Sequence, residues 1–175
     1  MQYREEIVKA MQLLNKESNT LFLGQSVEYS GHLLFNTLED AGVPMGKRIE
    51  MPVAEDMQMG ISIGLSLRGY LPISIYPRMD FLIMAMNQLV NHLDKMEEYS
   101  HGEYSPKVII RTAIASKSPL YPGIQHCQDY TTALRYILKK VNIRKLEYPE
   151  DIMMAYKNAL LDERSTILIE EVDSY

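Results

Sequence analysis

Short apolar runs rich in valine, isoleucine and leucine alternate along the chain with segments whose apolar residues recur every three or four positions. Apolar runs without regular polar alternation are typical of strands covered on both faces of a parallel sheet. The pattern predicts six strands: residues 20–24, a short strand near Ile49, and residues 71–76, 107–113, 142–148 and 165–172.

Helical spacing fills the intervals between these strands. Three sets of apolar residues each fall on one face of a helix: Ile7, Met11 and Leu14; Leu82, Met86, Leu89 and Leu93; and Tyr130, Leu134, Ile137 and Val141. A further helix is predicted to begin near Pro149, with Ile152, Tyr156 and Leu160 in its apolar stripe. Strands alternating with helices predict an α/β fold, a three-layer domain with a mostly parallel sheet and helices on both faces.

Residues 59–69, MGISIGLSLRG, do not fit one pattern alone. Apolar and small residues alternate there with a period of two, which favours a strand. As a helix the segment would be apolar on nearly all sides, with Gly60 and Gly64 one turn apart to allow close packing. Periodicity therefore leaves this segment open.

Composition bounds the class of protein. At 175 residues with 46% hydrophobic residues, the chain can form one domain with a substantial core. A net charge of -5 argues against a nucleic-acid partner, because phosphate binding favours a basic face. The single cysteine, Cys127, favours a reducing compartment. Since no signal peptide or membrane-length apolar segment is visible, a cytoplasmic protein without a membrane partner is expected.

Common catalytic and metal-binding motifs are missing from the sequence. It contains no GxxxxGK[ST], GxGxxG, GxSxG, HExxH or CxxC motif. The four histidines, His32, His92, His101 and His126, lack metal-ligand spacing, so no metal site is expected on this chain. Cys127 is expected to be a small buried hydrophobic residue.

Three residues could still carry chemistry. Glu55 stands in the apolar stretch MPVAEDMQMG, and a carboxylate in apolar surroundings is costly unless it is paired, caps a helix or has a function. The residues alone favour a helix-end acid, with Asp56 as the cap. His126, after the Pro122–Gly123 turn, fits a loop histidine bonded to backbone, and Phe81 fits a core aromatic.

Five segments nevertheless resemble a known family in their order along the chain. They are TLFLGQSVEYSG, KRIEMPVAEDMQMGISIGLSLRGYLPI, YPRMDFLIMAMNQLVNH, VIIRTA and GIQHCQDYTTALRYI. The chain resembles the thiamine-diphosphate pyrimidine-binding domain, as found in beta subunits of the 2-oxo acid dehydrogenase decarboxylase component and in the transketolase middle domain. The resemblance runs from about Thr20 to Val172. It implies that residues 1–175 form a single pyrimidine-binding domain and that residues 59–69 are a buried helix.

The resemblance also implies roles for the three candidates. Glu55 falls on the glutamate that hydrogen-bonds a ring nitrogen of the cofactor's aminopyrimidine and promotes the proton relay that forms the ylid. Phe81 falls on the aromatic residue that stacks on the pyrimidine ring. His126 falls on a histidine near the substrate or acyl carrier. Glu55 and His126 are thus the expected catalytic residues, and Glu55 and Phe81 the expected cofactor-binding residues.

The chain also departs from this family. The GDG sequence and later asparagine pair that hold magnesium and diphosphate are absent, as is the carboxy-terminal domain of beta subunits. A separate diphosphate-binding, alpha-type subunit is therefore expected to hold the magnesium, in a homo- or hetero-oligomer. The stretch IYPRMD adds Arg78, which could pair with an anionic substrate or with Asp80.

The function expected from the resemblance is that of a pyrimidine-binding subunit in a split thiamine-diphosphate enzyme. Such an enzyme would decarboxylate a 2-oxo acid, or transfer a two-carbon unit from a ketose, through the ylid. One alternative is a subunit of a two-subunit, sulfopyruvate-type decarboxylase. The other is a non-catalytic doubly wound domain kept for assembly, which would not need Glu55, Phe81 and His126 together.

Overall fold

The strands form one sheet in which every pair of neighbours is parallel. The computed structural model describes residues 2–31, 33–118 and 120–175. Within these residues the sheet has six strands in the order β2-β1-β3-β4-β6-β5. The strands are β1 (Thr20–Gly24), β2 (Arg48–Glu50), β3 (Leu71–Tyr76), β4 (Ile109–Ile114), β5 (Asn142–Leu146) and β6 (Thr166–Glu171).

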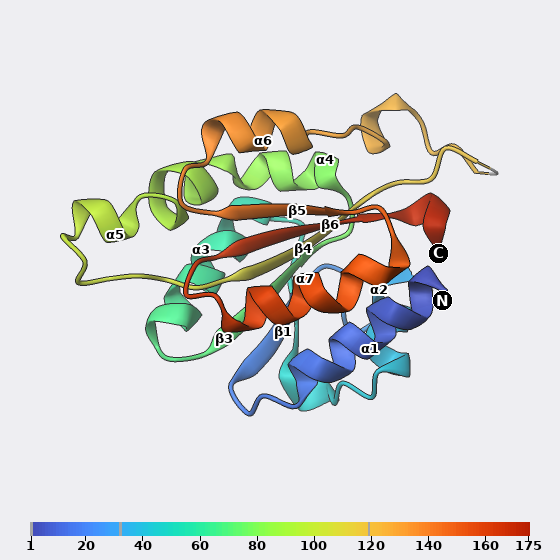
Figure 1. Cartoon of the computed structure of the whole chain (residues 1–175), viewed down its shortest axis with the longest axis horizontal. Helices are drawn as coiled ribbons and strands as arrows, with labels where there is room; N and C mark the ends of the chain where they lie inside the picture. Colours follow the sequence, from blue (N-terminus) through green and yellow to red (C-terminus); the bar gives the residue numbers. More distant parts are fainter. Residues whose placement is uncertain (1, 32, 119) are drawn as a thin grey trace.

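Helices cover both faces of the sheet, which confirms the predicted α/β architecture (Figure 1). One face carries α1 (Tyr3–Asn15), α2 (Leu33–Asp40) and α7 (Pro149–Leu161), and the other carries α3 (Glu55–Leu67), α4 (Met79–Leu82) and α6 (Thr131–Ile137). Shorter elements are η1 (Met45–Lys47), η2 (Ile83–Ala85), the π-helical η3 (Gln88–Leu93), α5 (Met96–Tyr99), η4 (Ile124–His126) and η5 (Val172–Ser174). Among the described residues, no helix is both long and apolar enough to cross a membrane.

The six predicted strands are confirmed, with small differences at their ends. Every residue of β3 and β4 is buried, as expected for central strands covered on both faces. The strands β4, β5 and β6 start later or end earlier than their apolar runs suggest, because hydrogen bonding rather than hydropathy sets the ends of a strand.

Residues 59–67 of the ambiguous segment are helical in α3, as the resemblance implied and against the period of two, and residues 68 and 69 form a turn. The implied burial is wrong for Ile61 and Leu67, whose side chains are exposed. The close packing expected at both glycines occurs at one. A Cβ on Gly60 would meet the side chain of Gln88 at 3.6 Å, whereas nothing lies within 4 Å of one on Gly64.

Two of the predicted apolar faces are altered in the structure. The residues from Leu82 to Leu93 do not form one regular helix, since α4 is followed by a 3₁₀ turn and then by the π-helical η3. Ile137 is exposed because α6 ends there, and Leu138 is buried in its place. The faces of α1 and α7 are confirmed by the burial of Ile7, Met11, Leu14, Ile152 and Tyr156.

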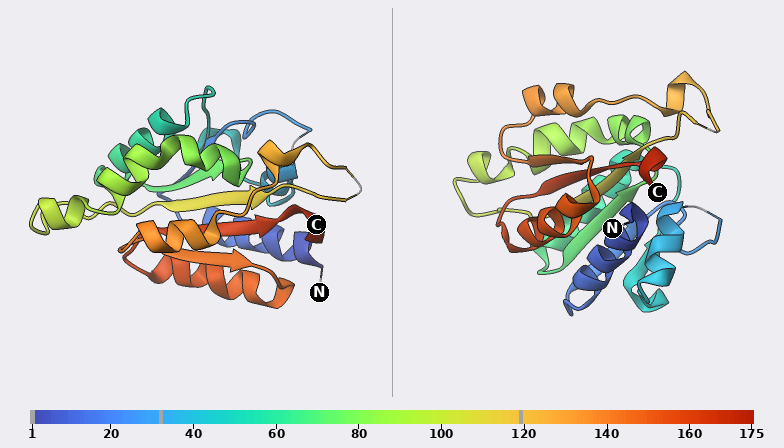
Figure 2. Two further views of the ribbon diagram at one scale, coloured as in Figure 1. Left: turned by 90° about the horizontal axis from the view of Figure 1, so that it is seen from above. Right: turned by 45° about the vertical axis from the view of Figure 1, so that its right-hand side comes forward.

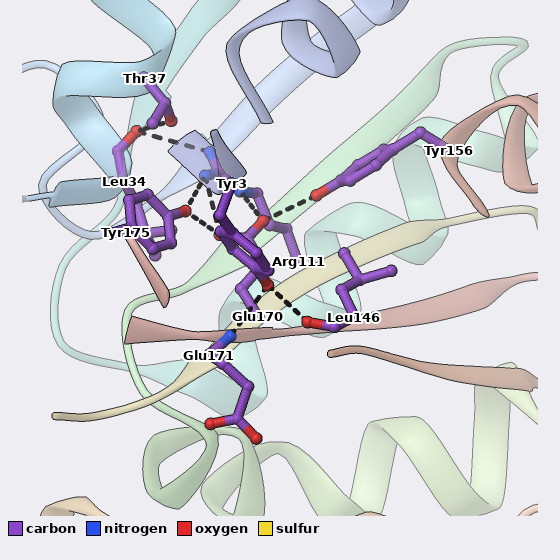
Figure 3. Close-up of polar contacts among 9 residues, drawn as sticks. All are labelled: Tyr3, Leu34, Thr37, Arg111, Leu146, Tyr156, Glu170, Glu171 and Tyr175. Carbon is purple, nitrogen blue, oxygen red and sulfur yellow. Dashed lines mark hydrogen bonds and ion pairs between the residues drawn. The ribbon is translucent and has the colours of Figure 1, made fainter. Parts of the chain in front are cut away.

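A buried ion pair joins the neighbouring strands β4 and β6 (Figure 3). Arg111 and Glu170 are both fully buried, and the guanidinium donates to the two carboxylate oxygens at 2.6 Å and 3.0 Å. The hydroxyl of Tyr156 donates to the same carboxylate at 2.8 Å, and that of Tyr175 donates to its other oxygen. Four donors therefore compensate the cost of burying one carboxylate.

The start of α1 and the end of the chain lie close together, beside the carboxyl ends of β5 and β6 (Figures 1 and 2). The rings of Tyr3 and Tyr175 are 5.4 Å apart, and the Tyr3 hydroxyl donates to the backbone oxygen of Leu146 at 2.8 Å. It also accepts a hydrogen bond from the Glu171 backbone at 3.0 Å. The first helix and the last strand are thus fastened to each other beside the buried ion pair.

Candidate functional site

The three candidate residues lie beyond the carboxyl ends of the strands. Glu55 follows β2 by a short loop, Phe81 lies in the helix after β3, and His126 lies in the long loop after β4. From β1 the chain passes outward to β2 and then returns to β3 on the other side of β1. This reversal makes the β1–β3 boundary a topological switch point, where open α/β sheets bind their ligands.

Glu55 is the first residue of α3, and its side chain is held by the loop after β1. It is 8% exposed, and its Oε1 accepts a hydrogen bond from Gln25 Nε2 at 2.9 Å. The Tyr76 hydroxyl donates to the Glu55 backbone oxygen at 3.3 Å. Among the described residues, Glu55 Oε2 has no hydrogen-bond partner. The carboxylate is therefore fixed through one oxygen while the other is available to a ligand.

The expectation that Asp56 caps this helix is wrong. The N-cap residue is Ala54, and no side chain caps α3. Asp56 instead accepts a hydrogen bond through Oδ2 from Gln88 Nε2 at 3.4 Å, and its Oδ1 is buried without a partner among the described residues. Two carboxylates thus occupy the first turn of α3, where the helix dipole favours negative charge.

The loop that carries Gln25 is held in place by hydrogen bonds from its backbone to a carboxylate. The backbone N–H groups of Ser26 and Val27 donate to the carboxylate of Glu50 at 2.7 Å and 2.8 Å. Just before it, Gly24 lies so close to β3 that a Cβ there would meet the Ile75 oxygen at 2.2 Å. Only glycine fits this contact, and it brings Gln25 into reach of Glu55.

Phe81 and His126 meet directly. Their rings make an edge-to-face contact with centroids 5.8 Å apart and planes at 80°. The guanidinium carbon of Arg78 lies 5.6 Å from the centroid of the same phenylalanine ring, a cation–π distance. Phe81 is partly exposed and does not belong to the core, so the core-aromatic interpretation is wrong.

His126 does not make the side-chain hydrogen bond to backbone that its loop position suggested. Its Nδ1 is buried and has no partner among the described residues. Its backbone N–H donates to the Gly123 oxygen at 3.0 Å. Cys127 is buried as predicted, with its Sγ 3.3 Å from the Ser116 oxygen.

The structure therefore brings Phe81 and His126 together and places Glu55 separately at the switch point. No hydrogen bond, ion pair or ring contact joins Glu55 to the other two among the described residues. The sequence interpretation missed Gln25 and Tyr76, the two partners of Glu55. A signal for both was present, since each is a polar residue at the carboxyl end of a predicted strand.

The described residues contain no group of three or more histidine, cysteine, aspartate or glutamate side chains that could hold a metal ion. His32 lies outside the described residues. The expectation of no metal ligands on this chain thus stays a prediction.

Comparisons with known proteins find similarity to the family that the sequence resembles. No family model matches the chain. It is 26% identical over 164 residues to the pyruvate dehydrogenase E1 component subunit beta of Gracilaria tenuistipitata var. liui, covering 93% of this chain and 50% of the relative. It is 23% identical over 181 residues to the 2-oxoisovalerate dehydrogenase subunit beta of Bacillus subtilis, covering 100% of this chain and 53% of the relative.

A solved structure described as a split gene transketolase, an inactive beta4 tetramer, matches with a TM-score of 0.72 and 20% identity. The match covers 97% of this chain and 51% of that one. The fold is thus a doubly wound α/β domain that matches the fold of this transketolase. By sequence the chain is similar to the beta subunits of 2-oxo acid dehydrogenases, which confirms the resemblance. It spans about half the length, or less, of the curated relatives that it matches.

Proposed function

We propose that this chain is the pyrimidine-binding subunit of a thiamine-diphosphate-dependent enzyme that acts on a 2-oxo acid or a ketose. The observation that carries the proposal is Glu55, a buried carboxylate at the switch point with one oxygen held by Gln25 and the other unbonded among the described residues. Relationship to dehydrogenase beta subunits over nearly the whole chain supports the same class.

The residues at the site fit the aminopyrimidine half of this cofactor. The free oxygen of Glu55 would hydrogen-bond a ring nitrogen, and the partly exposed face of Phe81 would stack on the ring. His126 Nδ1, buried and without a partner among the described residues, leaves a polar group that a substrate or a bound water could satisfy. The fit rests on these unpaired atoms.

Each residue then has a distinct task. Thiamine diphosphate, when bound, supplies the carbanion chemistry of the reaction at its thiazolium carbon. Glu55 holds a proton at the hydrogen bond to the pyrimidine nitrogen, and Gln25 fixes the orientation of its carboxyl group. Phe81 orients the pyrimidine ring. His126, whose ring makes an edge-to-face contact with the ring of Phe81, is placed to transfer a proton to or from the substrate.

A second subunit would complete the site. The sequence carries no GDG magnesium and diphosphate motif, so a diphosphate-binding, alpha-type partner is proposed to supply those ligands. Exposed apolar side chains on α3 and the following short helices, Met57, Ile61, Ile83 and Met84, offer a surface for it. An inactive assembly of beta chains, as described for the similar split transketolase, is what a subunit lacking its partner would form.

Calorimetry tests this division of the site. The purified chain, titrated with thiamine diphosphate and magnesium, should show weak binding or none, because the diphosphate contributes most of the contacts. Adding the diphosphate-binding subunit should give tight, magnesium-dependent binding. Tight, magnesium-dependent binding to the isolated chain would show that the site is not divided in this way.

A further inference from the structure

Three consecutive backbone N–H groups in the loop after β1 point at one carboxylate. Those of Ser26, Val27 and Glu28 donate to the side chain of Glu50, the last residue of β2, at 2.7 Å, 2.8 Å and 3.0 Å. A run of N–H groups of this kind forms a concavity that binds anions. The anion here belongs to the chain itself, and it is half-buried. The loop after β1 is therefore shaped around a charge from the neighbouring strand.

The turn at Ser26 depends on this charge. Ser26 has a φ of 58°, in the left-handed region that residues with a Cβ adopt only at a cost. Such a conformation persists where the surroundings hold it, and the N–H of Ser26 is held by Glu50 Oε1. The same turn sets the direction in which the preceding residue, Gln25, leaves β1. Without the carboxylate, the loop loses the contact that keeps Gln25 in its place.

Glu50 also supports the other side of the hydrogen bond between Gln25 and Glu55. The chain runs from Glu50 through a short loop to Glu55 at the start of α3. The end of β2 is tied to β1 at this point, because the Met51 N–H donates to the Gly24 oxygen at 2.9 Å. One residue thus holds the loop that carries the donor and lies at the strand end that leads to the acceptor.

We propose that Glu50 is a positioning residue for Glu55, whose carboxylate fills the anion-binding loop and thereby keeps Gln25 Nε2 on Glu55 Oε1. This inference rests on the proposed function, which assigns the proton of the site to Glu55. Both oxygens of Glu50 are engaged by the loop, so Glu50 acts through Gln25 and not on the cofactor.

NMR of the purified full chain tests this geometry without the cofactor. The side-chain N–H protons of Gln25, assigned by their loss in Gln25→Met, should exchange slowly with water. In Glu50→Ala their exchange should be faster by about tenfold or more, the factor for losing a hydrogen bond to a charged group. Added formate, which can occupy the vacated place, should restore part of the slow exchange. Glu50→Asp keeps the charge but is shorter by one methylene group, and it should lie between the two.

Asp94 offers a matched control. Its carboxylate also accepts three consecutive backbone N–H groups, from residues 139–141, at distances between 2.7 Å and 3.1 Å. These residues precede β5, at the end of the sheet away from the site. Asp94→Ala should therefore lower stability as Glu50→Ala does, yet leave the exchange of the Gln25 side chain as in wild type.

The enzyme reconstituted with its second subunit gives a functional readout. Glu50→Ala should slow exchange of the thiazolium proton by about tenfold or more while cofactor affinity changes little, and formate should recover part of the loss. Asp94→Ala should exchange like wild type. If Glu50→Ala does not fold, Glu50→Gln, which keeps one acceptor oxygen and loses the charge, replaces it in both assays.

Three results would overturn the inference. The first is Gln25 exchange that is unchanged in the Glu50 variants. The second is an equal acceleration in Asp94→Ala, which would reduce the effect to general loss of stability. The third is faster Gln25 exchange with wild-type exchange of the thiazolium proton. Failure of the cofactor proposal would appear as absent cofactor binding in calorimetry, while the Gln25 side chain would still respond to Glu50.

Discussion

Replacing Arg111 by methionine should cost a large part of the protein's stability. The change removes two of the four donors to the Glu170 carboxylate, at 2.6 Å and 3.0 Å, and leaves two phenol hydroxyls to hold a fully buried charge. Removing one partner of a buried ion pair typically costs about 3–5 kcal/mol. For a domain of this size each kcal/mol lowers the Tm by roughly 2–4 °C, which gives a fall of about 6–20 °C.

Chemical denaturation followed by circular dichroism measures the effect. Arg4→Met is the matched control, because Arg4 pairs with Asp40 at the surface and such pairs contribute at most about 1 kcal/mol. The double variant Arg111→Met with Glu170→Gln removes both charges. It should be less destabilised than the sum of the two single variants by about 2 kcal/mol or more, because neither charge is left unpaired.

Two results would refute this reasoning. If Arg111→Met were no more harmful than Arg4→Met, the buried pair would not be a main contributor to stability. If the two single effects simply added in the double variant, Arg111 and Glu170 would not be coupled, and the network of Figure 3 would be a set of independent contacts.

Two further predictions concern the site and the phenol groups. His126→Ala should lower turnover of the enzyme reconstituted with its second subunit while leaving cofactor affinity and Tm near wild type, with His92→Ala as control; unchanged turnover with a lowered Tm would make His126 structural. Burial, and then the charge of Glu170, raise the pKa of Tyr156 and Tyr175 well above the ordinary value. The unfolded phenols ionise near ~10 and the folded ones at higher pH, so this stability is intact below about pH 10 and is lost as pH rises through the folded pKa values. Urea midpoints should fall between pH 8 and about pH 10.5, and fall less in Tyr156→Phe; an equal fall in both proteins would contradict the assignment.

Much of the fold could be predicted from the sequence because the strands are buried on both faces. Their runs of apolar residues indicate the positions of the strands, whereas the strand order and the register are found only in the structure. Local periodicity gave the wrong secondary structure in segments whose conformation is decided by long-range packing. It favoured a strand for residues 59–69, which form part of α3, and one regular helix where the π turn of η3 intervenes.

The site could be predicted only in part. Glu55, Phe81 and His126 are candidates that the resemblance implies, but Gln25 and Tyr76, the two partners of Glu55, come from the loop after β1 and from β3. Arg111 and Glu170 were visible as charges inside the apolar runs VIIRTA and ILIEEV, and two opposite charges in buried neighbouring strands predict a pair. Which strands are neighbours is decided by the three-dimensional order, and β4 and β6 are separated by β5 in the sequence.

The central claim is that Glu55 acts as the acid of a thiamine-diphosphate site. Exchange of the thiazolium proton with deuterated water, followed by NMR in the reconstituted enzyme, tests it most directly. Glu55→Gln keeps the acceptor for Gln25 Nε2, so the fold should persist, but it cannot relay a proton. Exchange should slow by about 10²–10⁴-fold, the usual contribution of a general acid or base. Asp56→Asn, which neutralises the adjacent acid of the same helical turn, should exchange like wild type. If Glu55→Gln also exchanges like wild type, Glu55 is only an acid at a helix end and the account is wrong.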